Sequence, residues 1–348
     1  MNEGLLGTIE LGLDTFGDIT VGPNGTTLHH AEVLRNIVAE AELADRLGLD
    51  FFGVGEHHRD DFAVSAPEVV LAAIAARTNR IRLGSAVTVL SSDDPVRVFQ
   101  RFSTLDALSN GRAEVIMGRG SFTESFPLFG FDLDQYEVLF EERMALFVEL
   151  LKEGPTTWSG TTRAALTGQR VYPPTRSGHL RTWVAVGGTP QSVVRAAHYG
   201  LPLMLAVIGG DHLAFAPFVD LYKRALNSAG HGMLPIGVHS PGHVAESDEQ
   251  AREELWPHYQ AMHGRIGKER GWPPLTRQAF DQMAGPTGAL CVGSPNTVAT
   301  KIVRAVKALG LSRFDMKYSA GTLPHEKLMR SIELYGTKVA PLVREQLA

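Results

Sequence analysis

The chain has few of the residues that would cross-link it or anchor it in a membrane. It contains one cysteine, Cys291, in 348 residues, so an intramolecular disulfide is impossible and a cluster of thiolate metal ligands is excluded. No apolar run approaches the roughly 20 residues of a membrane span, and the N-terminus lacks the basic and apolar segments of a signal peptide. These absences favour a protein of the reducing cytoplasm.

A large excess of charge of either sign is also missing. Lys and Arg total 33 against 38 Asp and Glu, a net charge of −5 without a basic block. This balance argues against a nucleic-acid-binding surface and against a polybasic membrane contact, and it favours a small-molecule partner. Hydrophobic residues make up 44% of the chain, enough to bury a core without cross-links or structural metals.

Short apolar runs rich in β-branched residues alternate with segments of helical period along almost the whole chain. This alternation indicates βαβ units and a parallel sheet. A doubly wound open sheet would be expected to carry a Gly-rich dinucleotide turn after its first strand, and Asp14-Thr15-Phe16-Gly17 lacks that turn. We therefore predict an α/β fold, a single (β/α)₈ barrel over residues 1–348, with strands at Thr8–Asp14, Phe51–Gly55, Ile81–Val89, Ala113–Met117, Thr182–Val186, Pro202–Val207, Ile236–His243 and Phe314–Tyr318.

Two stretches interrupt this rhythm. Residues 154–174 are rich in Thr, Gly and Pro, which predicts an irregular insertion. A longer excursion lies between the seventh and eighth strands, at about residues 264–289, and its segment from Arg265 to Pro274 has the composition of a mobile lid or loop.

Glu56-His57-His58 follows the second predicted strand, at the end of the barrel where active sites are built. Two histidines beside a carboxylate are compatible with metal ligands, with an acid/base pair or with a structural hydrogen-bonding cluster. Adjacent residues at a strand end point in opposite directions, which lowers the weight of the metal interpretation. Acid/base chemistry is favoured because imidazole titrates nearest neutral pH and Glu56 could orient the ring.

Two further segments suit an anion such as a phosphate. Gly118-Arg119-Gly120-Ser121 follows the fourth strand and combines close backbone approach with a guanidinium. Gly187-Gly188-Thr189-Pro190-Gln191-Ser192 follows the fifth strand and opens a helix. A glycine turn with a solvated arginine and a simple helix start are the structural alternatives. Gly293-Ser294-Pro295-Asn296-Thr297 is a second-ranked anion site near the end of the chain.

Other side chains carry weaker signals. An apolar substrate pocket could be lined by Phe16, Phe122, Phe126 and Trp272, although aromatic residues more often pack in a core. Cys291 begins an apolar run and is expected to be buried and inert. His239 and His243 fall on one face of the seventh strand, where a role in the site and a structural pairing are equally open.

These motifs together resemble the luciferase-like flavin-dependent monooxygenases, and the resemblance covers nearly the whole chain. Each motif is common alone, but their joint order is specific. The matching pieces include Gly55-Glu56-His57-His58, Gly84-Ser85-Ala86-Val87-Thr88, Leu108-Ser109-Asn110-Gly111-Arg112, Gly118-Arg119-Gly120-Ser121, Gly187-Gly188-Thr189-Pro190, Val292-Gly293-Ser294-Pro295 and Leu323-Pro324-His325-Glu326-Lys327.

The resemblance implies that reduced FMN, supplied by a separate NAD(P)H-dependent flavin reductase, reacts with O₂ and one oxygen atom is transferred to a small organic substrate. A homodimer or higher homo-oligomer, without nucleic acid or membrane, is expected. His57 matches the family's catalytic histidine, with Glu56 and His58 as its supports. The FMN-binding positions are matched by Ala86 and Val87, joined by a non-proline cis peptide, and by Arg119, Gly187, Gly188, Thr189 and Ser192.

One departure limits the resemblance, and three alternatives stay open. Gly118 stands where the luciferase catalytic subunit has a reactive cysteine, so light emission is not implied. A deazaflavin-dependent oxidoreductase of the same fold would transfer hydride instead of activating O₂. A non-catalytic flavin-binding paralogue would keep the phosphate residues without turnover, and a metal-dependent barrel hydrolase would use the histidines as ligands.

Overall fold

The computed structural model describes residues 9–22, 24–120 and 122–348. Thr8 of the first predicted strand and Ser121 of the first anion motif lie outside these residues. Among the described residues, no helix combines the length and apolar character needed to span a bilayer.

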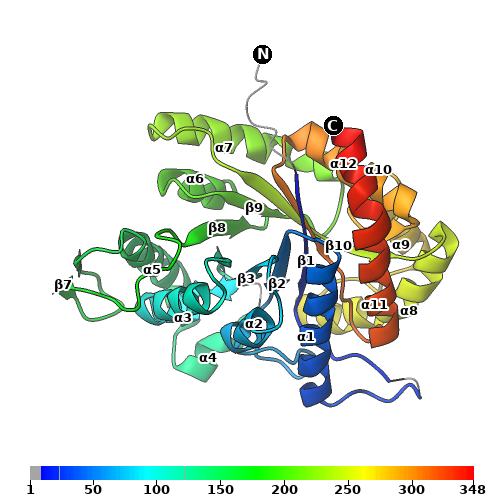
Figure 1. Ribbon diagram of the computed structural model, residues 1–348, viewed down its shortest axis with the longest axis horizontal. Coiled ribbons are helices and arrows are strands. Elements are labelled where there is room, and N and C mark those ends of the chain that lie inside the picture. Colours follow the sequence, from blue (N-terminus) through cyan, green and yellow to red (C-terminus); the bar gives the residue numbers. More distant parts are fainter. Residues whose placement is uncertain (1–8, 23, 121) are drawn as a thin grey trace.

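Eight parallel strands close into a barrel surrounded by helices, which confirms the predicted (β/α)₈ architecture (Figure 1). The hydrogen-bonded order runs from β10 through β12, β1, β2, β3, β5, β8 and β9, and β9 pairs with β10 to close the ring. The barrel strands are β1 (Glu10–Thr15), β2 (Phe51–Val54), β3 (Arg82–Ser85), β5 (Ala113–Gly118), β8 (Arg181–Val186), β9 (Leu203–Ala206), β10 (Ile236–Val244) and β12 (Arg313–Lys317).

The strands are buried on both faces, as parallel strands covered by helices must be. Most of the apolar core lies between the barrel and its helices. A smaller apolar cluster of Phe51, Ile116, Trp183 and Met204 lies apart from it. Two short strands extend the sheet, β4 (Thr88–Val89) beside β5 and β11 (Cys291–Gly293) beside β10.

The helices begin where the sequence offers helix-start chemistry. Pro67, Pro95, Pro190 and Pro295 each occupy a first helical position, where a missing N–H costs nothing. The helices are α1 (His30–Arg46), α2 (Pro67–Ala75), α3 (Pro95–Leu108), α4 (Ser125–Phe129), α5 (Tyr136–Leu150), α6 (Pro190–His198), α7 (Ala216–Ser228), α8 (Asp248–Arg270), α9 (Arg277–Met283), α10 (Pro295–Leu309), α11 (His325–Leu334) and α12 (Ala340–Leu347).

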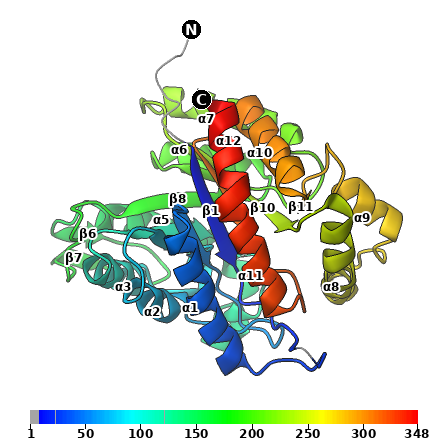
Figure 2. The same ribbon diagram turned by 45° about the vertical axis from the view of Figure 1, so that its right-hand side comes forward.

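The two predicted irregular segments are more regular than expected. Residues 154–174 contain an antiparallel hairpin of β6 (Thr156–Trp158) and β7 (Leu166–Gln169). The prediction of a loop from Arg265 was wrong, because α8 continues to Arg270 and ends at Gly271 in the left-handed conformation. The hairpin and α8 lie at opposite ends of the molecule in both views (Figures 1 and 2).

Candidate active site

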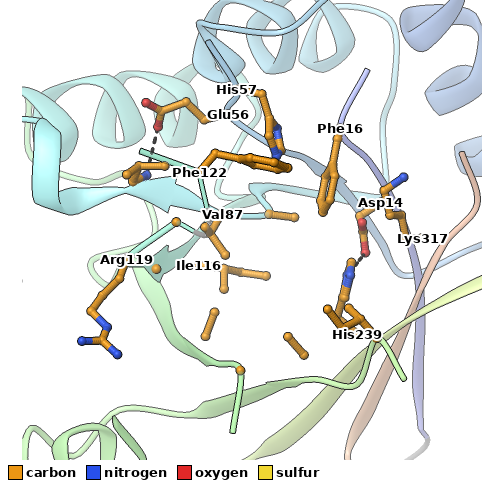
Figure 3. Close-up of a pocket in the computed structure, with 18 of the residues that line it drawn as sticks. Asp14, Phe16, Glu56, His57, Val87, Ile116, Arg119, Phe122, His239 and Lys317 are labelled. Carbon is orange, nitrogen blue, oxygen red and sulfur yellow. Dashed lines mark hydrogen bonds and ion pairs between the residues drawn. The ribbon is translucent and has the colours of Figure 1, made fainter. Parts of the chain in front are cut away.

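A cavity of about 720 Å³ opens at the carboxyl ends of the barrel strands. All eight barrel strands contribute residues to its wall, and most of these residues lie at or after the carboxyl ends of the strands, as in other barrels of this architecture. Figure 3 shows side chains from these strand ends pointing into one space. The lining includes Asp14, Glu56, Ala86, Gly118, Gly187, Ala206, His239 and Lys317.

His57 is enclosed by aromatic rings on the cavity wall. Its ring centroid lies 4.6 Å from that of Phe16, 4.3 Å from Phe62 and 5.4 Å from Phe122. Burial lowers the pKa of His57 to about 3, because the charged imidazolium would lose its hydration there. Its Nδ1 is buried and has no hydrogen-bond partner among the described residues. The imidazole is therefore neutral near pH 7, and its Nδ1 stays unpaired within the part of the chain that the structure describes.

Glu56 orients His58 and not His57. The Nε2 atom of His58 lies 3.0 Å from Oε1 of Glu56, and Oε2 of Glu56 accepts a hydrogen bond of 2.9 Å from the Val89 N–H. The alternation of side chains along an extended backbone explains this pairing, since residues 56 and 58 share one side and residue 57 points to the other. The three predicted residues still line the same cavity.

The peptide bond between Ala86 and Val87 is cis, as the resemblance implies. Both residues line the cavity. The side chain of Val87 also explains the glycine at position 118, because a Cβ added to Gly118 would lie 2.5 Å from Cγ2 of Val87. A cysteine at this position would therefore require Val87 to move.

The two predicted anion motifs meet in this cavity. Arg119, Gly187, Thr189 and Ser192 line it, whereas Gly188, in the left-handed region at φ +117°, does not. The hydroxyl of Thr189 donates to that of Ser192 over 2.8 Å. The hydroxyl groups at the start of α6 and the Arg119 guanidinium thus line one cavity, and this cluster suits a phosphate.

Arg195 is part of this cluster, and the sequence interpretation missed it. Its Nη1 donates to the Ser192 hydroxyl over 3.3 Å, and its guanidinium pairs with Glu141 and Glu137. Arg119 also pairs with Glu137. The position of Arg195 one helical turn after Ser192 was the available signal, since residues three apart share a helix face.

The second-ranked anion site at the start of α10 already holds a carboxylate. Oδ1 of Asp248 accepts from the Ser294 N–H over 2.6 Å, and its Oδ2 accepts from the Thr297 hydroxyl over 2.9 Å. Burial alone would raise the pKa of Asp248, but these hydrogen bonds outweigh it and lower the pKa. The donors of this helix start are therefore used within the protein, and the segment does not line the cavity.

The remaining predicted residues divide between cavity and core. Phe16, Phe122 and Trp272 line the cavity, whereas Phe126 is fully buried against Tyr136, so its predicted pocket role was wrong. Cys291 is buried as predicted, and burial raises the pKa of its thiol to about 11.

The two histidines of β10 have different surroundings. His239 lines the cavity and its Nδ1 lies 2.8 Å from Oδ2 of Asp14. His243 is fully buried outside the cavity wall, with its Nε2 2.9 Å from Oε2 of Glu254. Within the described residues, no three His, Cys, Asp or Glu side chains are grouped so that they could hold a metal ion.

The chain belongs to the luciferase-like monooxygenase family, whose model matches residues 15–313. It is 27% identical over 314 residues to 4-hydroxyprotoasukamycin monooxygenase of Streptomyces nodosus subsp. asukaensis, covering 86% of this chain and 84% of that relative.

Solved structures share the fold. The monooxygenase RslO1 from Streptomyces bottropensis has a TM-score of 0.82 at 24% identity, covering 96% of this chain and 99% of that one. The oxygenating constituent of 3,6-diketocamphane monooxygenase from Pseudomonas putida, a type II Baeyer-Villiger monooxygenase in complex with FMN, has a TM-score of 0.75 at 18% identity, with 96% and 99% coverage. Structures of F420-dependent enzymes also share this fold.

Proposed function

We propose that this chain is an FMN-dependent monooxygenase that uses reduced FMN and O₂ to oxygenate a small organic substrate. One observation carries the proposal: a single cavity joins a phosphate-compatible cluster to the cis Ala86–Val87 peptide and to the enclosed His57. Its volume lies within the range of roughly 300–1,000 Å³ that is typical of ligand sites.

The residues present fit FMN. Arg119, Arg195, Thr189 and Ser192 would hold the phosphate, since guanidinium and hydroxyl donors match its oxygens. Ala86 and Val87 would support the ring system. When bound, the reduced flavin supplies the reduction of O₂ and the transfer of one oxygen atom.

The chain supplies binding, orientation and exclusion of water. His57 is neutral and offers a nitrogen for a hydrogen bond or a proton, while Glu56 and His58 support the loop that carries it. The last turns of α8 contribute Ile266 and Arg270 to the cavity wall, and Trp272 follows them. A roof of this kind keeps water from a reactive oxidant.

The experiment is a fluorescence titration of the purified chain with FMN and with F420, followed by turnover with a flavin reductase that supplies reduced FMN. We expect FMN to bind, and in the presence of a substrate that is oxygenated we expect less hydrogen peroxide per O₂ consumed than free reduced FMN produces. Binding of F420 alone would favour a deazaflavin-dependent hydride-transfer enzyme. Binding of FMN without turnover would indicate a non-catalytic paralogue. The predicted homo-oligomer and reductase partner stay predictions, which light scattering and coupled assays test.

A further inference from the structure

Two histidines face the same cavity on either side of Phe16. The Phe16 ring centroid lies 4.6 Å from that of His57 and 5.9 Å from that of His239, and its plane is within 8° of the His239 plane. Figure 3 shows Phe16 between His57 and the hydrogen-bonded pair of Asp14 and His239. The cavity therefore presents two imidazoles, and they differ in their polar partners.

Asp14 fixes the orientation of His239. Its carboxylate is 1% exposed, and its Oδ2 lies 2.8 Å from Nδ1 of His239. Its other oxygen, Oδ1, is buried and has no hydrogen-bond partner among the described residues. A carboxylate in this position keeps a hydrogen on Nδ1 of the imidazole. Nε2, for which the described residues provide no partner, is then left for a ligand.

The charged residues next to Asp14 and His239 pair with other groups and do not compete for this hydrogen bond. Asp315, beside His239 on β12, pairs with Arg313 at 2.8 Å. Lys317, also on β12, donates to Asp18 over 3.0 Å. On the other flank β9 contributes the uncharged Ala206. Among the described residues, His239 is the group that hydrogen-bonds to the Asp14 carboxylate.

We propose that His239, held by Asp14, donates the proton that the reaction of reduced FMN with O₂ consumes. This inference rests on the proposed function. Without organic substrate, FMNH⁻, O₂ and one proton give oxidised FMN and hydrogen peroxide, so two electrons pass from the flavin to O₂. In this reaction His239, carrying a proton on each ring nitrogen, would give its Nε2 proton to the hydrogen peroxide that leaves and would keep its Nδ1–H on Asp14. Water then restores the proton.

His57 is the weaker candidate for this step. Its pKa, lowered to about 3 by burial, leaves it without the second proton near pH 7. Paired groups whose surroundings differ in this way divide acid and base roles in many active sites. His57 is then the group that accepts, and His239 is the group that donates.

His239→Asn tests the proposal, because the Asn amide nitrogen can keep the contact with Asp14 while Nε2 is removed. His243→Asn is the matched control, since it changes the same residue type on the same strand, also paired with a carboxylate but outside the cavity wall. We expect His239→Asn to slow peroxide release from enzyme-bound reduced FMN by about 10²-fold or more. Added imidazole buffer should restore the rate in proportion to its imidazolium concentration. His243→Asn should release peroxide at the wild-type rate, and imidazole buffer should not change that rate.

A second measurement needs no flavin. In ¹⁵N spectra of the histidine rings of the flavin-free protein, His239 should show a proton fixed on Nδ1, and Asp14→Asn should remove this preference. The inference would be overturned if His239→Asn released peroxide at the wild-type rate, or if it released peroxide slowly and imidazole buffer did not restore the rate. Neither result would contradict the proposed function, provided that the wild type binds FMN and turns over. A wild type that does not bind FMN would overturn the proposed function, and the inference with it.

Discussion

Arg119 is the side chain on which the proposed phosphate site depends most directly. Replacement with alanine should weaken FMN binding by about 1.5–3 kcal/mol, the range for charge-assisted hydrogen bonds, with little effect on the fold. Fluorescence titration with FMN measures the loss. In the flavin-free protein Glu137 pairs with both Arg119 and Arg195, so a phosphate must compete with this carboxylate.

Glu137, the carboxylate that competes with the phosphate, provides the matched control variant. Glu137→Gln removes its charge and should tighten FMN binding by a few-fold, the opposite direction from Arg119→Ala. Equal FMN affinity in wild type and Arg119→Ala would show that the phosphate does not lie at this cluster.

Replacement of His57 distinguishes a role in catalysis from a role in flavin binding. His57→Ala should keep FMN affinity and lower turnover about 10²–10⁴-fold, the usual contribution of a general acid/base group. Because burial lowers the pKa of His57 to about 3, its own titration should not shape the rate between pH 5 and 8. His58→Ala, which removes the Glu56 pair instead, is the control. Full turnover combined with a lower melting temperature in His57→Ala would assign the residue a structural role.

At the scale of the elements, buried periodic segments were predictable and contacts between distant segments were not. The strand predictions locate all eight barrel strands because each contains a short apolar run bounded by turns. The predicted strand Ile81–Val89 is divided in the structure into β3 and β4. The helical end of α8 was missed because Gly264 and Gly267 weaken its intrinsic helix preference. Its last turns are instead supported by tertiary ion pairs, from Arg265 to Asp60 and from Glu269 to Arg59.

In the candidate site, too, contacts between residues distant in the sequence could not be predicted. The motifs at strand ends located His57, Arg119 and Ser192, because a barrel gathers these ends by construction. The pairing of Asp14 with His239 joins residues 225 positions apart, and no spacing along the chain reveals it. Side-chain direction within a motif also needs the structure, as the pairing of Glu56 with His58 shows.

The last turns of α8 and Trp272 cover the cavity, and we call them the roof. The ion pairs at the end of α8 should hold this roof closed, and breaking them should open it. Arg59, in the loop after β2, donates to both carboxylate oxygens of Glu269, over 2.8 and 2.6 Å. Glu269→Ala should speed FMN release several-fold in stopped-flow measurements and reduce its dependence on salt. Glu246→Ala, which removes a pair with Arg330 outside the cavity wall, should leave FMN release unchanged. An equal effect of both variants would contradict a local roof.

At the scale of the whole molecule, a charged cluster holds the barrel strands together from inside. Glu114 is fully buried on β5 and accepts from Arg313 of β12 over 2.6 Å and from the indole of Trp183 on β8 over 3.1 Å. The Arg313 guanidinium lies 3.4 Å from the ring centroid of Phe51 on β2. The cluster thus connects four strands that are distant in sequence.

Glu114→Gln should therefore destabilise the whole barrel. Removing one partner of a buried ion pair typically costs about 3–5 kcal/mol. Burial alone would raise the pKa of Glu114, but Arg313, Arg181 and Arg82 outweigh it and lower the pKa to about 2. A carboxyl whose folded pKa lies below its unfolded value contributes stability that is present above the unfolded pKa, near 4.5, and is lost as the pH falls toward 2.

The difference in unfolding free energy between wild type and Glu114→Gln should therefore be largest at pH 7 and shrink below about pH 4.5, as urea unfolding at several pH values would measure. Glu149→Gln changes an exposed carboxylate paired with Lys152 on the surface and should alter stability by less than about 1 kcal/mol at any pH. A constant difference between wild type and Glu114→Gln from pH 7 to pH 3 would show that the glutamine disturbs packing. The ionised carboxylate would then not be what holds the four strands.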